Sequence, residues 1–102
     1  MQSSLTSQQR QKLKGLAHGS KPPLFQVGKD GLSEPVLKSL GQALSDHQLI
    51  KVQFLEKGDI DRYEYAGKIA GELKAEVVQV IGFKAVFYRR NPEKRDLLGP
   101  AA

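Results

Sequence analysis

Cysteine is absent from the sequence, and this absence excludes several classes of site at once. Without thiols the chain can form no disulfide, no thiolate metal site and no cysteine nucleophile. The two histidines, His18 and His47, are far apart, and no carboxylate stands at metal-ligand spacing from either. Ser33, Asp46 and His47 would make a catalytic triad on paper, but Ser33 is better explained as a helix cap. We therefore expect no enzyme, no metal, no cofactor and no small-molecule substrate.

Long apolar runs are also missing. The longest apolar stretches, such as "VVQVIGF", are far too short to span a bilayer, and no apolar segment follows the charged N-terminal residues as in a signal peptide. A length of 102 residues fits one domain. We expect a soluble, cytoplasmic, monomeric protein.

Positive charge is in excess and unevenly distributed. The net charge is +5, with basic clusters in residues 10–31 and 84–95 and an acidic majority in residues 56–76. Such charges can simply keep a small protein in solution. Two basic clusters around an acidic middle nevertheless favour a polyanion-facing surface with a solvated opposite side. Membrane binding is disfavoured because no helix combines a wide apolar face with a basic one.

Hydrophobic periodicity and capping residues predict three helices and four strands. Helices are expected near residues 6–18, 33–46 and 59–73, and strands near residues 24–27, 49–54, 76–82 and 84–90. Thr6 and Gln9 have the spacing of a capping box, and Ser33 is a natural N-cap. The order αβαβαββ predicts a single α/β (α+β) domain, with a four-stranded mixed sheet covered by helices.

A glycine-rich segment stands between a predicted strand and the predicted helix cap Ser33. Gly28 and Gly31 enclose Lys29 and Asp30, and such a loop brings backbone N–H groups close to an anion because no Cβ stands in the way. The following helix N-terminus would add further N–H groups and a partial positive charge. The spacing fits neither a Walker A loop nor a dinucleotide fingerprint. A KH domain also has a Gly-x-x-Gly loop, but places it between two helices, whereas here a strand precedes it. An ordinary turn is the remaining alternative.

Aromatic side chains offer a second mode of contact, since bases stack on them. Tyr63, Tyr65, Phe87 and Tyr88 are the candidates. Strand alternation predicts that one of Phe87 and Tyr88 faces the core, so at most part of this set is available for stacking.

Two long segments carry a family resemblance. "LKGLAHGSKPPLFQVGKDGLSEPVLKSLGQALSDHQLIKVQF" and "AEVVQVIGFKAVFYRR" are similar to the chloroplast RNA splicing and ribosome maturation (CRM) domain, and more closely to its free-standing bacterial, YhbY-like members. The resemblance covers about residues 5–90. It implies a fold similar to the C-terminal domain of translation initiation factor three. It also implies a domain over residues 5–91, between a flexible N-terminus (1–4) and a flexible tail (92–102).

The same resemblance implies RNA binding and association with precursors of the large ribosomal subunit. The implied RNA-binding residues are the loop and basic positions around it: Gly28, Lys29, Asp30, Gly31, Lys12, Lys14, Lys21, Arg89 and Arg90. The sequence departs from the family at Lys74, where a glycine often closes the third helix, and at Pro35. A general translation or tRNA-binding factor, a protein–protein adaptor on the ribosome, and an RNA-modifying enzyme are the alternatives.

Overall fold

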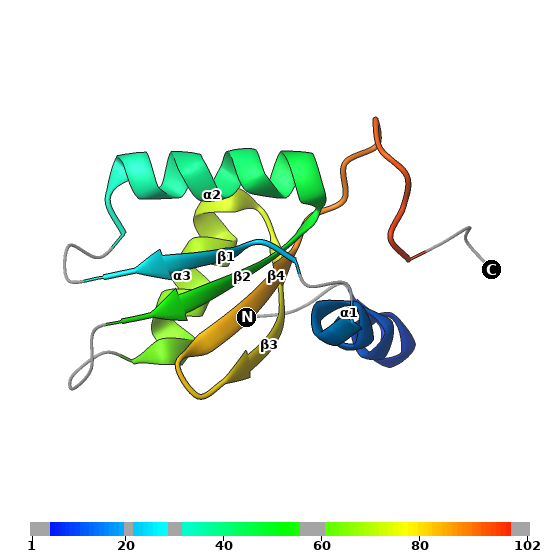
Figure 1. Cartoon of the computed structure of the whole chain (residues 1–102), viewed down its shortest axis with the longest axis horizontal. Helices are drawn as coiled ribbons and strands as arrows, with labels where there is room; N and C mark the ends of the chain where they lie inside the picture. Colours follow the sequence, from blue (N-terminus) through cyan, green and yellow to red (C-terminus); the bar gives the residue numbers. More distant parts are fainter. Residues whose placement is uncertain (1–4, 20–21, 29–31, 56–60, 99–102) are drawn as a thin grey trace.

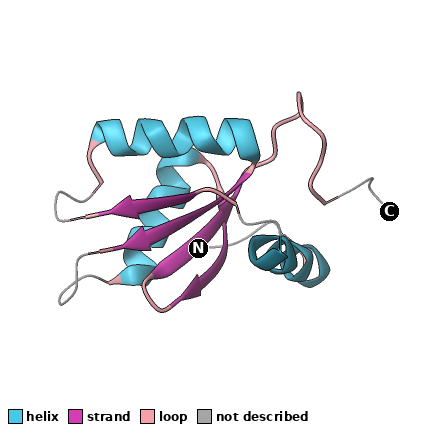
Figure 2. Ribbon diagram, in the orientation of Figure 1, coloured by secondary structure: helices cyan, strands magenta, loops and turns pink. Residues whose placement is uncertain are grey.

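The computed structural model describes residues 5–19, 22–28, 32–55 and 61–98. Seven elements follow in the predicted order αβαβαββ (Figures 1 and 2). They are α1 (Ser7–Gly19), β1 (Leu24–Val27), α2 (Glu34–His47), β2 (Leu49–Phe54), α3 (Arg62–Leu73), β3 (Glu76–Ile81) and β4 (Lys84–Tyr88). The predicted fold class is confirmed: this is a single α/β domain.

The four strands form one mixed sheet in the order β1-β2-β4-β3. β1 and β2 run parallel, joined through α2, while β4 pairs antiparallel with both β2 and β3. The short β3–β4 connection is a hairpin with Gly82 at φ +57°. Because β1 and β2 are parallel, the segment after Val27 leaves the sheet at the same edge as the segment after Phe54.

Local capping explains where the helices begin. The Thr6 N–H donates to Gln9 Oε1 at 2.9 Å and the Gln9 N–H donates to Thr6 Oγ1 at 3.1 Å, which is the predicted capping box. Ser33 caps α2, as predicted. The third helix begins at Arg62, later than the predicted residue 59, because Asp61 is its N-cap and accepts hydrogen bonds from two backbone N–H groups.

Helices cover both faces of the sheet (Figure 1). α2 and α3 pack on one face over a main core that includes Leu44, Ile50, Ile69 and Phe87. α1 packs on the other face, where Leu13 and Ala17 join a smaller cluster from β2, β3, β4 and the segment after β4. A single 13-residue helix covers only part of a four-stranded sheet, so part of the α1 face stays open.

A β-bulge in β3 adapts the sheet to α1. The register shifts between Val77 and Gln79, so that Val78 packs in the α1 cluster while Val77 packs in the main core. Arg10 of α1 donates from Nη1 to Val77 O at 2.6 Å and to Val78 O at 2.8 Å. The guanidinium therefore fastens the start of α1 to the bulge.

The segment after β4 extends beyond the end of the sheet and then bends toward α1 (Figure 1). Leu97 and Leu98 pack against the α1 cluster, and Gln48 Nε2 donates to Arg95 O at 2.7 Å. The predicted domain boundaries stay a prediction. Within the described residues, no helix has the length and apolar character needed to cross a membrane.

Candidate nucleic-acid interface

Gly28 lies directly after β1, at the edge of the sheet where Val27 is in register with Phe54. The predicted loop residues Lys29, Asp30 and Gly31 lie outside the described residues, so their contacts stay a prediction. A methyl group added at Gly28 would meet only Leu55 Cδ1, at 4.0 Å, which is ordinary van der Waals contact. Packing at this position therefore does not require glycine.

Lys12 and Lys14 lie on α1, and the structure gives them different surroundings. Lys12 Nζ donates to Leu98 O at 2.8 Å, so this exposed ammonium contacts the segment after β4. Lys14 is half-buried and faces the open part of the sheet face. Lys21, also predicted, is outside the described residues.

Arg89 connects three elements through its guanidinium. Nη1 donates to Leu73 O at 2.9 Å at the end of α3, and Nη2 donates to Gly41 O at 2.8 Å and Ser45 Oγ at 2.7 Å on α2. A cation here also suits the negative end of the α3 dipole. These bonds show a structural role for Arg89; its predicted role in RNA binding is not tested by them.

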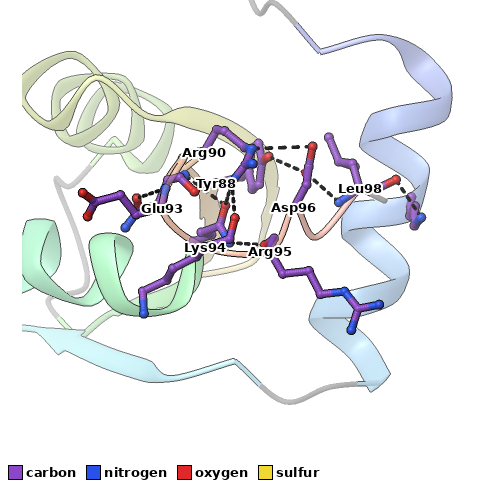
Figure 3. A network of polar contacts seen from close by, with 10 residues as sticks. Tyr88, Arg90, Glu93, Lys94, Arg95, Asp96 and Leu98 are labelled. Carbon is purple, nitrogen blue, oxygen red and sulfur yellow. Dashed lines mark hydrogen bonds and ion pairs between the residues drawn. The ribbon is translucent and has the colours of Figure 1, made fainter. Parts of the chain in front are cut away.

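Arg90 belongs to a polar network that holds the segment after β4 (Figure 3). Its Nη1 donates to Gln48 Oε1 at 3.1 Å and to Lys94 O at 2.8 Å, and it also donates to Asn91 O. Nε lies 3.5 Å from Asp96 Oδ2. The side chain is 40% exposed, so one side of it faces solvent.

The predicted residues do not form one contiguous patch. Tyr88, just before Arg89, is in register with Leu49 at the start of β2, whereas Gly28 follows the residue opposite the end of β2. The two ends of this six-residue strand are roughly 17 Å apart at about 3.3 Å per residue. Arg89 and Arg90 thus lie at the sheet edge opposite Gly28.

The sheet instead brings two further lysines to the α1 face. Lys51 of β2 and Lys84 of β4 lie on the same side of the sheet as Lys14, where a groove of about 440 Å³ remains between α1 and strands β2 to β4. We call this hollow the α1 groove; among its lining residues are Lys14, His18, Lys51, Gln79, Ile81 and Lys84. The sequence alone could have placed Lys51 on this face, because alternation in "LIKVQF" separates it from the apolar core residues. Only the order of the strands shows that Lys84 lies near it.

Charge differs between the two faces of the sheet. α1 carries three basic and no acidic side chains, and the open sheet beside it adds Lys51 and Lys84. The helices on the other face carry both signs of charge: Glu34, Asp46, Glu64 and Glu72 against Lys38, Arg62 and Lys68. The excess of positive charge therefore lies on the α1 side of the sheet, and the expected role of this surface in binding a polyanion stays a prediction.

The residues considered for catalysis do not converge. Ser33 Oγ accepts from the Val36 N–H at one end of α2, while Asp46 and His47 lie at the other end, roughly 20 Å away along a 14-residue helix. In the part of the chain that the structure describes, no group of three or more His, Asp or Glu residues is placed to hold a metal ion.

Comparison with known proteins agrees with this fold and its sequence pattern. Residues 5–89 match the CRS1 / YhbY (CRM) domain. The chain belongs to the CRM family. PA4753 of Pseudomonas aeruginosa, named a probable RNA-binding protein, is 38% identical over 90 residues, which cover 88% of this chain and 86% of the relative. YqeI of Bacillus subtilis, named in the same way, is 32% identical over 93 residues, covering 91% and 96%.

A solved structure in this family matches the CRM fold described above. The solution structure of the hypothetical Staphylococcus aureus protein SAV1595, described as a candidate RNA-binding protein, superposes with a TM-score of 0.75. The two sequences are 37% identical, and the match covers 89% of this chain and 94% of the other. The names of these relatives indicate no catalytic activity.

Proposed function

We propose that this CRM domain is a non-enzymatic RNA-binding protein that acts in ribosome assembly by binding ribosomal RNA of large-subunit precursors. The observation that carries RNA binding is the uneven distribution of charge: α1 and the open sheet beside it have an excess of basic side chains, whereas the helices of the opposite face carry both signs in nearly equal number. Several relatives are named RNA-binding proteins, which supports this partner over other polyanions. The ribosomal role rests on the family resemblance.

In this proposal phosphate contacts hold the RNA. The glycine loop offers backbone N–H groups and Lys29, and the basic side chains of α1 extend the surface. Gly28 supports phosphate binding by the loop. Packing leaves room for a Cβ at this position, so glycine is not required there by its neighbours. Recognition through phosphates reads RNA shape more than sequence.

Replacing Lys29 with Ala should weaken binding to a structured large-subunit RNA fragment. With one phosphate no longer neutralised, the slope of log K against log salt also falls by about one. Binding is measured by fluorescence anisotropy across a salt series. Lys38→Ala is the matched control, because Lys38 is an exposed lysine on α2, on the opposite face. Equal affinities and slopes for wild type and Lys29→Ala would remove Lys29 from the interface.

Gradient sedimentation of a cell lysate tests the biological role separately. We expect the protein to migrate with free large-subunit particles and their precursors. Peak association with tRNA or small subunits would instead indicate a general translation factor. Salt-insensitive binding to RNA-free ribosomal proteins would indicate an adaptor.

A further inference from the structure

The α1 groove is an open hollow on the sheet face that α1 only partly covers. Its sheet side is built from two neighbouring cross-strand rows: Lys51 lies opposite Val86, and Lys84 lies opposite Ile81. The bulge in β3 turns Gln79 to this side, in register with Val86. The fold therefore places cations, an amide and an apolar surface together in one hollow of about 440 Å³.

Cations in the groove have no internal partner. The ammonium groups of Lys14, Lys51 and Lys84 make no hydrogen bond or ion pair within the described residues, and the groove's described lining includes no carboxylate. Lys14 and Lys51 are also half-buried, and Lys51 lies on an inner strand. Partly desolvated, unpaired ammonium groups of like charge repel one another, so the free fold gains nothing from gathering them. An anionic ligand would remove this repulsion.

Gly15 is a second, independent feature of the groove. It lies in the interior of α1, where glycine destabilises a helix relative to alanine. It lines the groove, and a Cβ built on it meets no atom within 4 Å. Packing therefore offers no reason for the absence of a side chain, whereas a side chain here would narrow the groove.

We propose that the α1 groove binds one unpaired nucleotide of an RNA strand. The lysines bind its phosphate, the base lies on the apolar side chain of Ile81, and the Gln79 amide contacts the base edge. Ile81 is 61% exposed, so this apolar surface is available. A pocket of this volume holds a small ligand, and the base of an unpaired nucleotide can turn outward to enter it without breaking a base pair. The inference rests on the proposed RNA-binding function and adds a single-strand subsite to it.

Filling the groove tests the subsite. Gly15→Leu adds bulk to the groove wall, and we expect it to weaken binding of short single-stranded oligouridylate about tenfold while the melting temperature stays equal or rises. Gly71→Leu is the control: Gly71 is an exposed glycine inside α3, on the opposite face, where an added Cβ also meets no atom. This variant should bind like the wild type. Unchanged oligouridylate affinity in Gly15→Leu would overturn the proposal.

Removing the cations gives a second measurement that does not depend on added bulk. The double variant Lys51→Gln/Lys84→Gln should reduce the salt slope for oligouridylate by about 0.7 for each phosphate that is no longer neutralised. If Gly15→Leu has a lower melting temperature than the wild type, the salt slope of the double variant tests the subsite instead. A slope equal to that of the wild type would then overturn the proposal. Binding of polyglutamate in place of oligouridylate would also overturn it, in favour of an acidic protein partner.

The outcomes also separate this subsite from the proposed function. If the wild type and Gly15→Leu bind large-subunit RNA equally and neither binds oligouridylate, the groove proposal fails and the proposed function stands. If the wild type binds neither RNA, both fail. Lys29→Ala should impair the structured RNA more than oligouridylate, and Gly15→Leu should show the opposite preference.

Discussion

At the residue scale, two helices end on residues other than glycine in the left-handed conformation. Gln48 after α2 has φ 65°, and Lys74 after α3 has φ 54°. Glycine is the usual residue at such a position because a Cβ is strained there. Gln48 compensates for the strain: its buried side chain donates to Arg95 O and accepts from Asn91 N at 3.0 Å. Lys74 is exposed and makes no side-chain hydrogen bond with any described residue.

Lys74→Gly should therefore raise the free energy of unfolding by about 0.5–1 kcal/mol, because it relieves the strain and removes no side-chain hydrogen bond. Urea denaturation measures the change. Gln48→Gly is the contrasting variant and should lower the free energy of unfolding by about 1–3 kcal/mol, since buried partners lose their hydrogen bonds. A gain in both variants would show that strain dominates at both sites.

At the scale of elements, Arg89 shows why the basic positions cannot be assigned from charge alone. In the sequence it is one of several cations at the end of a strand. In the fold its guanidinium joins the end of β4 to α2 and α3 through three acceptors. The guanidinium fork suits this geometry, and an ammonium group cannot reproduce it.

We expect Arg89→Lys to lower the free energy of unfolding by about 1–3 kcal/mol although it preserves the charge. Urea denaturation checks this, with Arg95→Lys as the control because Arg95 is exposed and its described contact is through its backbone carbonyl. The control should change by less than about 0.5 kcal/mol. A stability loss no larger than that of the control would contradict the bracing role.

The aromatic residues of β4 make the same point about elements. Alternation predicted that one of Phe87 and Tyr88 faces the core, and this is correct for the core under α2 and α3, where Phe87 packs. Tyr88 points to the opposite face and is also buried, at 5% exposure, because α1 covers that side. Alternation assigns a side chain to a face but does not say whether a distant helix covers that face.

At the scale of the whole molecule, the segment after β4 connects the end of the sheet to α1. Tyr88 Oη donates to Asp96 Oδ1 at 3.4 Å, beside the Arg90–Asp96 contact (Figure 3). Burial raises the pKa of Tyr88 above its usual value, and the Asp96 carboxylate raises this pKa further. Both effects favour the neutral phenol in the folded protein.

A raised folded-state pKa contributes stability below the unfolded pKa of about 10, and this contribution disappears as the pH rises through the folded pKa. The free energy of unfolding should therefore fall more steeply above about pH 10 in the wild type than in Tyr88→Phe. Urea denaturation across a pH series measures this. Tyr63→Phe is the control, because Tyr63 is 64% exposed and its removal should leave the slope unchanged. If the free energy of unfolding falls equally steeply with pH in all three proteins, the raised pKa of Tyr88 is contradicted.

The sequence by itself determined those features of the fold that depend on residues close together in the chain. Capping at Thr6 and Ser33, the positions of the strands, the order αβαβαββ and the family all follow from local patterns, and the fold agrees with each. Local hydrogen bonds and side-chain periodicity act over a few residues, so a linear reading captures them. The predicted start of α3 differs from the observed one because Asp59 and Asp61 are equally plausible caps in sequence.

Only the tertiary structure decided which charges share a surface. The parallel β1–β2 pair and the antiparallel β4 place Arg89 and Arg90 at the edge opposite Gly28, and they bring Lys51 and Lys84 beside Lys14. These neighbours come from strand order and register, which depend on contacts between segments far apart in the chain.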